Sequence, residues 1–348
     1  MNTAAKALVA AAAMVTLAVP ILAQQRSPGE RPAGACRAEI IRLCGADRAE
    51  LRACLRERAS ELSEQCRAGL RARMEQRRAG AGTGAGAQTP PAQTLAYGSN
   101  ALQALDLWVP EGARSAPLVL FVHGGGWSRG SKDNAGSRAM PGHMLEQGYA
   151  FASIDYRLVP SATVEQQAGD VAAALAHLLG RAETLGIDPT RVVITGHSAG
   201  AHLVALVGTD ERYLKAAGLS FADLRGVIPN DGAAYDIASQ LSDAGPMMKD
   251  TYTQAFGTDP ARHAALSPTL HAAAPNAPAF LLLHVQRKDG VAQNRALADA
   301  LKRAGTPVEI GSFPGDGLRG HAEINRRLGE PDYPATPVMD AWLKKVLG

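Results

Sequence analysis

The chain has 348 residues, of which 46% are hydrophobic and 20% charged, with a formal net charge of +3. This composition is that of a globular protein and excludes a largely disordered chain. Residues 24–80 are Arg-rich, but acids alternate with the arginines and no aromatic side chain occurs there, so we expect no nucleic-acid contact. We expect this segment to make at most a weak contact with an anionic envelope surface.

Residues 1–23 have the layout of a secretory signal peptide. One lysine, Lys6, precedes an apolar run that ends at the small residue Ala23. The run is shorter than a comfortable membrane span, so we expect cleavage rather than an uncleaved anchor. The sequence therefore predicts a periplasmic or secreted protein.

All four cysteines lie in a segment of helical character, residues 35–78: Cys36, Cys44, Cys54 and Cys66. An even, clustered set in an exported chain predicts two disulfides, and the cysteines have neither C-x-x-C spacing nor a histidine among them, so we expect no metal. Three pairings are open, and we favour the nested one, Cys36 with Cys66 and Cys44 with Cys54, because a helical hairpin would bring these pairs together. The segment resembles the cysteine-rich repeat of Golgi glycoprotein 1 and of many bacterial exported proteins, which implies a binding or structural unit.

Residues 79–95 are rich in Gly, Ala, Thr and Pro and predict a flexible linker. In residues 96–348, strand-like runs then alternate with helical ones such as 164–186 and 291–305. The expected strands are residues 105–109, 117–123, 150–156, 191–196, 226–230, 279–285 and 308–313. This alternation predicts an α/β domain with a largely parallel sheet, whose reactive groups collect at the carboxyl ends of strands.

A glycine run, Gly124 to Gly126, follows the expected strand at 117–123. Successive glycines allow backbone N–H groups to face a developing oxyanion, so this run is a candidate for an oxyanion hole, completed by the N–H of Ala199. A phosphate loop is disfavoured because residues 125–132 end in Ser-Lys, the reverse of the required order. A plain flexible turn stays open as the alternative.

The pentapeptide GHSAG, residues 196–200, joins a β-branched strand to an Ala- and Leu-rich helix. Glycines on both sides of Ser198 let strand and helix cross closely and expose the hydroxyl, which is typical of a nucleophilic serine. The alternative is a serine that only caps the helix.

A nucleophilic serine needs a histidine base held by a carboxylate, in the chain order Ser, acid, His for this kind of turn. Asp289 is the first acid after the expected strand at 279–285, and His321 follows the strand at 308–313. We predict these two as orienting acid and general base, with Asp316 and Asp231 as second choices for the acid. Helix capping is the alternative role for Asp289 and for His321.

The motifs HGGGW, SIDYRL and GHSAGAHL, followed by Asp289 and His321, resemble the α/β-hydrolase carboxylesterases, nearest the group with feruloyl and acetyl esterases and kynurenine formamidase. The resemblance covers residues 96–348 and implies an α/β-hydrolase fold. It also implies that Gly125, Gly126 and Ala199 supply the oxyanion N–H groups, that Trp127 lines the acyl side of the pocket and that Arg157 makes a buried structural ion pair. We expect His197 and His202 to shape the pocket or pack beside the serine.

These features predict an exported serine hydrolase that cleaves a small-molecule carboxylic ester and needs no cofactor. An aryl formamidase is the second hypothesis, because GHSAGAHL is shared with that group. A catalytically silent binding protein is the third. The acyl group, the alcohol and the oligomeric state are left open.

Overall fold

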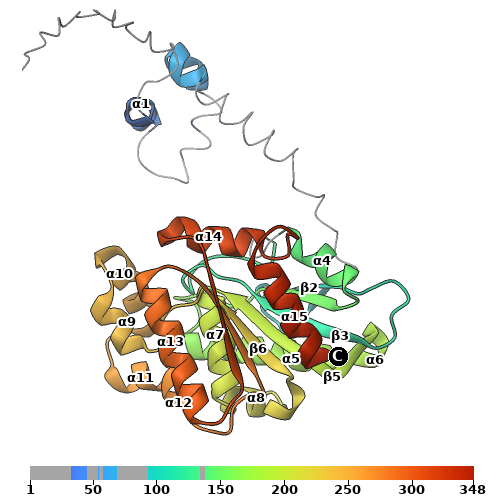
Figure 1. Cartoon of the computed structure of the whole chain (residues 1–348). Helices are drawn as coiled ribbons and strands as arrows, with labels where there is room; N and C mark the ends of the chain where they lie inside the picture. Colours follow the sequence, from blue (N-terminus) through green and yellow to red (C-terminus); the bar gives the residue numbers. More distant parts are fainter. Residues whose placement is uncertain (1–32, 45–53, 55–57, 69–92, 134–137) are drawn as a thin grey trace, which may run out of the picture. The chain divides into compact units, whose positions relative to one another are not determined.

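The computed structural model describes residues 33–44, 54, 58–68, 93–133 and 138–348 (Figure 1). The chain divides into two compact units, Met1–Gly84 and Ala85–Gly348. The expected signal peptide and residues 79–92 of the expected linker lie outside the described residues. Within the described residues, no helix is both long and apolar enough to cross a membrane.

The first unit contains α1 (Ala33–Cys44) and the short 3-10 helix η1 (Ala59–Glu61). Disulfides join Cys36 to Cys66 and Cys44 to Cys54, which confirms the nested pairing. Cys66 is 3% exposed, so its end of the Cys36–Cys66 bridge is buried. Disulfides of this kind persist in oxidising compartments such as the periplasm or the cell exterior.

The second unit is built on one eight-stranded sheet in the order β1-β2-β4-β3-β5-β6-β7-β8. The strands are β1 (Gln93–Ala96), β2 (Ala104–Trp108), β3 (Ala116–Val122), β4 (Ala150–Ile154), β5 (Ile187–His197), β6 (Gly226–Asn230), β7 (Phe280–Val285) and β8 (Val308–Phe313). Strands β3 to β8 are parallel, whereas β2 is antiparallel to both of its neighbours. The seven strands and the largely parallel sheet expected from the sequence are present.

Strand β1 is an addition, because residues 93–95 were expected to be linker. It is a short edge strand in which half-buried and exposed residues alternate. Four residues, two of them polar, are too few to give a recognisable strand pattern. The sheet therefore begins before residue 96.

The helices of this unit are α4 (Met140–Glu146), α5 (Val164–Leu179), α6 (Ala182–Leu185), α7 (Ala199–Thr209), α8 (Arg212–Ala216), α9 (Ile237–Asp243), α10 (Pro246–Phe256), α11 (Pro260–Ala265), α12 (Pro268–His271), α13 (Lys288–Arg303), α14 (Gly317–Arg327) and α15 (Ala335–Leu347), with the 3-10 helix η2 (Phe221–Asp223). Helices α5, α7 and α13 pack in one apolar core, and α4, α14 and α15 in a second one (Figure 1). The sheet thus separates two layers of helices, as expected for an α/β domain.

Two local expectations have clear outcomes. The helix expected over 164–186 is interrupted at Gly180 and Arg181, between α5 and α6. Arg157 makes the expected ion pair, with Nη2 lying 2.7 Å from a carboxylate oxygen of Asp170 in α5. The Asp170 side chain is only 2% exposed, so this pair fixes the chain that follows β4 against α5.

Candidate active site

Ser198 lies on a tight turn between β5 and α7. Its backbone has φ 58° and ψ −117°, a conformation that residues with side chains rarely adopt. A Cβ at Gly200 would overlap the carbonyl oxygen of Val122 in β3, and a Cβ at Gly196 would overlap that of Gly200. The glycines are therefore required for the close crossing of strand and helix, and the turn expected at Ser198 is present.

The Ser198 hydroxyl, the His321 imidazole and the Asp231 carboxylate form a continuous chain of hydrogen bonds. Nε2 of His321 lies 3.0 Å from Oγ of Ser198, and Nδ1 donates to Oδ2 of Asp231 at 2.6 Å. Strands β5 and β6 are neighbours, so Ser198 and Asp231, which directly follow them, meet at the same edge of the sheet. The geometry is that of a nucleophile, a base and an orienting acid.

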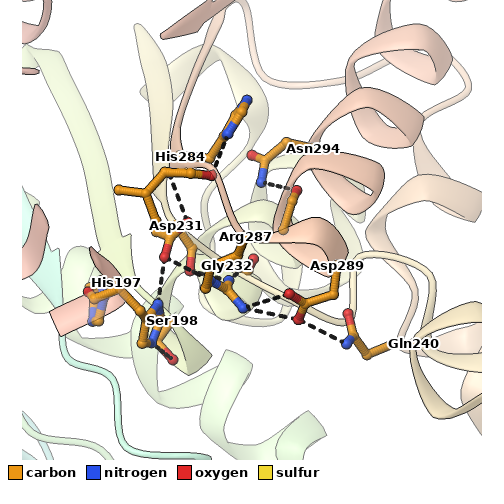
Figure 2. A network of polar contacts seen from close by, with 12 residues as sticks. His197, Ser198, Asp231, Gly232, Gln240, His284, Arg287, Asp289 and Asn294 are labelled. Atoms are coloured by element: carbon orange, nitrogen blue, oxygen red, sulfur yellow. Dashed lines mark hydrogen bonds and ion pairs between the residues drawn. The ribbon is translucent and has the colours of Figure 1, made fainter. Parts of the chain in front are cut away.

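The structure does not bring Asp289 to His321, which corrects the choice of acid made from the sequence. The carboxylate of Asp289 instead lies 2.9 Å from Nη1 of Arg287 and accepts a hydrogen bond from Nε2 of Gln240 at 3.3 Å (Figure 2). The reason is the start of α13, which begins at Lys288 rather than near residue 291. Asp289 is therefore part of the first helical turn.

Asp231, a second choice for the acid, occupies the place expected for Asp289. The other second choice, Asp316, is the N-cap residue of α14. The signal that could have identified Asp231 is its position directly after the last residue of a fully buried strand, β6.

The Asp231 carboxylate is completely buried. Burial alone raises the pKa of a carboxyl group, but the hydrogen bond from His321 and the charge of Arg287 outweigh it and lower the pKa of Asp231 to about 2. The N–H of Val285 also donates to Oδ1, at 3.2 Å. Asp231 is therefore ionised at neutral pH and can stabilise a protonated imidazole.

The loop after β3 lies close to Ser198. Gly125 and Gly126 have φ values of 124° and 60°, and a Cβ at Gly124 would lie 3.0 Å from Cβ of Ser198. The N–H of Ala199 belongs to the first turn of α7, where backbone donors lack partners within the helix. These N–H groups remain our prediction for the oxyanion donors.

His197 packs directly on the base. Its ring centroid lies 4.4 Å from that of His321, and its Nε2 donates to the backbone carbonyl of His321 at 3.0 Å. Burial, followed by the charge of the neighbouring His321, lowers the pKa of His197 to about 3, so its ring is neutral at neutral pH. His197 thus packs beside the serine turn and holds the main chain of the base, while a contact with substrate remains a prediction.

Trp127, which follows the glycine loop, lies in an aromatic cluster and is only 2% exposed. Its ring centroid lies 4.7 Å from that of Phe256 and 6.0 Å from that of Tyr252, both in α10. Its Nε1 donates to Nδ1 of His202 at 3.4 Å, and Nε2 of His202 donates to the carbonyl of Leu266. The loop is therefore backed by a packed apolar wall.

Within the described part of the chain, one group of potential metal ligands comes together, formed by His197, Asp231 and His321. Their ligand atoms lie within 4.8 Å of one another. All three side chains make the hydrogen bonds already described, so the group is better explained as a proton-transfer arrangement than as a metal centre.

Comparison with known proteins gives a match to the BD-FAE family model over residues 105–301. Esterase LipC of Mycobacterium tuberculosis is 35% identical over 114 residues, which is 32% of this chain and 28% of that protein. Isoprenylcysteine alpha-carbonyl methylesterase ICME of Arabidopsis thaliana is 31% identical over 114 residues, 32% of this chain and 26% of that protein. The chain thus matches little more than a quarter of the length of either relative.

Among solved structures, esterase B from Lactobacillus rhamnosis is similar, with a TM-score of 0.60 and 22% sequence identity. The match covers 80% of this chain and 93% of that one. The shared architecture confirms the α/β-hydrolase fold expected from the sequence.

Proposed function

This chain belongs to the BD-FAE family, and from that premise we propose that it hydrolyses carboxylic esters through Ser198 as nucleophile, His321 as general base and Asp231 as orienting acid. The observation that carries the proposal is the chain of hydrogen bonds from Ser198 Oγ to His321 Nε2 at 3.0 Å and from His321 Nδ1 to Asp231 Oδ2 at 2.6 Å. A capping serine would not need this partner. The esterase relatives support the same reaction class.

The mechanism follows from the positions of these groups. His321 takes the proton of the Ser198 hydroxyl as the oxygen attacks the ester carbonyl, and the ionised Asp231 stabilises the resulting imidazolium. The N–H groups of Gly125, Gly126 and Ala199 hold the oxyanion of the tetrahedral intermediate. His321 then returns the proton to the leaving alcohol and activates a water that releases the acid from the acyl-enzyme.

We further propose a short acyl group. Trp127 follows the oxyanion loop directly and is packed against Phe256 and Tyr252, so little room remains for a long chain on that side. A Cβ at Gly126 would lie 3.0 Å from the methyl group of Thr251, so α10 lies close against the loop. The packed wall therefore favours small acids over fatty acids.

The same proposal includes export, supported by the two disulfides and by the signal-peptide pattern of residues 1–23. An exported enzyme meets esters outside the cytoplasm, which disfavours a formamidase of cytoplasmic metabolism.

The test is hydrolysis of p-nitrophenyl esters from acetate to octanoate by the full chain and by Ser198→Ala, beside an N-formyl aromatic amide. We expect the wild type to cleave acetate and butyrate esters fastest and Ser198→Ala to lose this activity. Turnover of the formyl amide alone would contradict the esterase proposal and favour the formamidase. Equal rates for wild type and variant would contradict the role of Ser198.

A further inference from the structure

Arg287 forms ion pairs with Asp231, the acid of the proposed triad, and with Asp289 (Figure 2). Oδ2 of Asp231 accepts two hydrogen bonds, from Nδ1 of His321 at 2.6 Å and from Nε of Arg287 at 3.0 Å. The oxygen that holds the base is therefore shared with a permanent cation. A triad needs only the first of these two bonds, so the second requires its own explanation.

The guanidinium of Arg287 is held in one position by every part of its fork. Nη1 lies 3.1 Å and 2.9 Å from the two carboxylate oxygens of Asp289, and Nη2 donates to the backbone carbonyls of Asp231 and Gly232 at 3.3 Å and 3.2 Å. The side chain is only 10% exposed. A buried guanidinium with these partners is fixed relative to Asp231, and its charge is little screened by solvent.

Asp289 balances this cation on the outer side. Its side chain is 35% exposed, and it also accepts a hydrogen bond from Gln240, whose own Oε1 accepts the N–H of Ala234. The four ionisable groups thus alternate in charge from the centre outward when the base is protonated: His321, Asp231, Arg287 and Asp289. Each group acts on the next across a hydrogen-bonded contact.

We propose that Arg287 and Asp289 are positioning residues that set how strongly Asp231 stabilises the protonated base, and with it the pH range in which the enzyme works. The inference rests on the proposed roles of Ser198, His321 and Asp231. Arg287 weakens the hold of Asp231 on a protonated His321, because it repels that charge and shares the same oxygen. Asp289 partly neutralises Arg287 and so acts in the opposite direction.

Other titratable groups also face this region. His197 from the end of β5 contacts the His321 ring, and Tyr235 and Tyr333 interact electrostatically with Asp231. On α14 itself, Arg319 and Glu323 are the charged residues within two positions of the base. Arg287 itself contributes to the lowered pKa of His197, and Tyr252 on α10 interacts electrostatically with both Arg287 and Asp289. The test therefore depends on the opposite directions of the two shifts rather than on their size.

The experiment uses the full chain and the variants Arg287→Met, Arg287→Lys and Asp289→Asn. The rate of inactivation by a fluorophosphonate is measured against pH, because it reports activation of Ser198 whatever the natural ester is. Hydrolysis of p-nitrophenyl acetate is measured over the same pH range. Arg262→Met is the matched control, since Arg262 also forms a part-buried ion pair, with Glu165, but on α11.

We expect Arg287→Met to move the midpoint of the acid limb of the pH–rate profile to higher pH by about one unit. We expect Asp289→Asn to move this midpoint to lower pH by about half a unit. Arg287→Lys keeps the charge and should stay near the wild type. Arg262→Met should leave the midpoint unchanged. The opposite directions are the signature, because loss of packing alone would lower the rate without moving the midpoint in either direction.

Unchanged midpoints, or shifts of both variants in the same direction, would overturn the inference. If Arg287→Met loses its folded circular dichroism spectrum, Asp289→Asn decides alone, with a downward shift supporting the inference and an unchanged midpoint overturning it. A wild type that reacts with the fluorophosphonate but cleaves no ester contradicts only the proposed substrate, and the inactivation profiles still decide. A wild type inert toward both reagents overturns the proposed nucleophile and this inference together.

Discussion

Asp231 accepts a 2.6 Å hydrogen bond from Nδ1 of His321, and it does so from the end of β6. The next strand, β7, leads instead into Arg287 and then α13. The acid of the proposed triad therefore follows β6, the strand next to β5 and Ser198. The sequence had predicted an acid after β7, one strand further away.

The two aspartates should differ sharply in their effect on rate. Asp231→Asn leaves no carboxylate to hold the His321 tautomer and should lower kcat for p-nitrophenyl acetate by about 10³- to 10⁴-fold. Asp289→Asn should stay within about tenfold of the wild type, because Asp289 does not contact the base. A loss in Asp289→Asn as large as that in Asp231→Asn would mean that Asp289 supplies the acid.

The oxyanion loop should be sensitive to a single methyl group. Gly126→Ala places a Cβ 3.0 Å from Cγ2 of Thr251 and adds backbone strain at φ 60°. We expect kcat to fall by about tenfold or more, with a smaller effect on KM. In the double variant with Thr251→Ser, which removes the opposing methyl group and keeps the hydroxyl, part of the activity should return. Full activity in Gly126→Ala would argue against this loop as the source of the oxyanion donors.

Stability should fall as the pH is lowered below neutrality, because neutral histidines are buried. Burial lowers the pKa of His202 from 6.5 to about 4, although its hydrogen bond to the Leu266 carbonyl acts against the shift. The unfolded chain therefore binds a proton first, and stability is fully present above pH 6.5 and is lost as the pH falls toward 4. The loss from His202 alone amounts to about 3 kcal/mol.

His202→Gln tests this origin, because glutamine offers an acceptor to Trp127 and a donor to Leu266 but does not titrate. The dependence of Tm on pH between neutrality and pH 4 should become flatter in this variant. His271→Gln on α12, where the histidine is half-buried, is the control for the substitution itself. An unchanged slope in His202→Gln would show that other groups govern acid unfolding.

Reduction of the disulfides should affect the stability of the first unit but not the activity of the second. Both disulfides lie within residues 36–66, and residues 85–348 contain no cysteine. Dithiothreitol should therefore destabilise the first unit by about 2–5 kcal/mol per bridge while leaving ester hydrolysis unchanged. A parallel loss of esterase activity on reduction would mean that the disulfide unit contributes to the site.

Much of this molecule could be predicted from local sequence patterns. The buried strands are continuous apolar runs, and a glycine-bracketed serine permits few backbone solutions, so the sheet and the turn at Ser198 follow directly. His321 and Ser198 come together as expected, because Ser198 directly follows β5 and His321 lies on α14, the helix that follows β8.

The acid was harder to predict because two aspartates follow neighbouring strands. The start of α13 decides between them, and a shift of three residues moves Asp289 from a strand end into a helical turn. Helix boundaries are the least certain part of a sequence-based prediction. Arg287 gave no signal either, since a lone arginine after a strand is usual at a protein surface and only its contacts with Asp231 and Asp289 distinguish it.

The most direct test of the central claim is to identify the residue that a serine-directed organophosphate modifies in the full chain. Intact mass and peptide mapping after exposure to diethyl p-nitrophenyl phosphate should give one modified site per chain, at Ser198, with loss of ester hydrolysis in proportion to labelling. His321→Gln should label far more slowly although its serine is intact. Labelling at another residue, or an unmodified chain that still cleaves esters, would contradict the account.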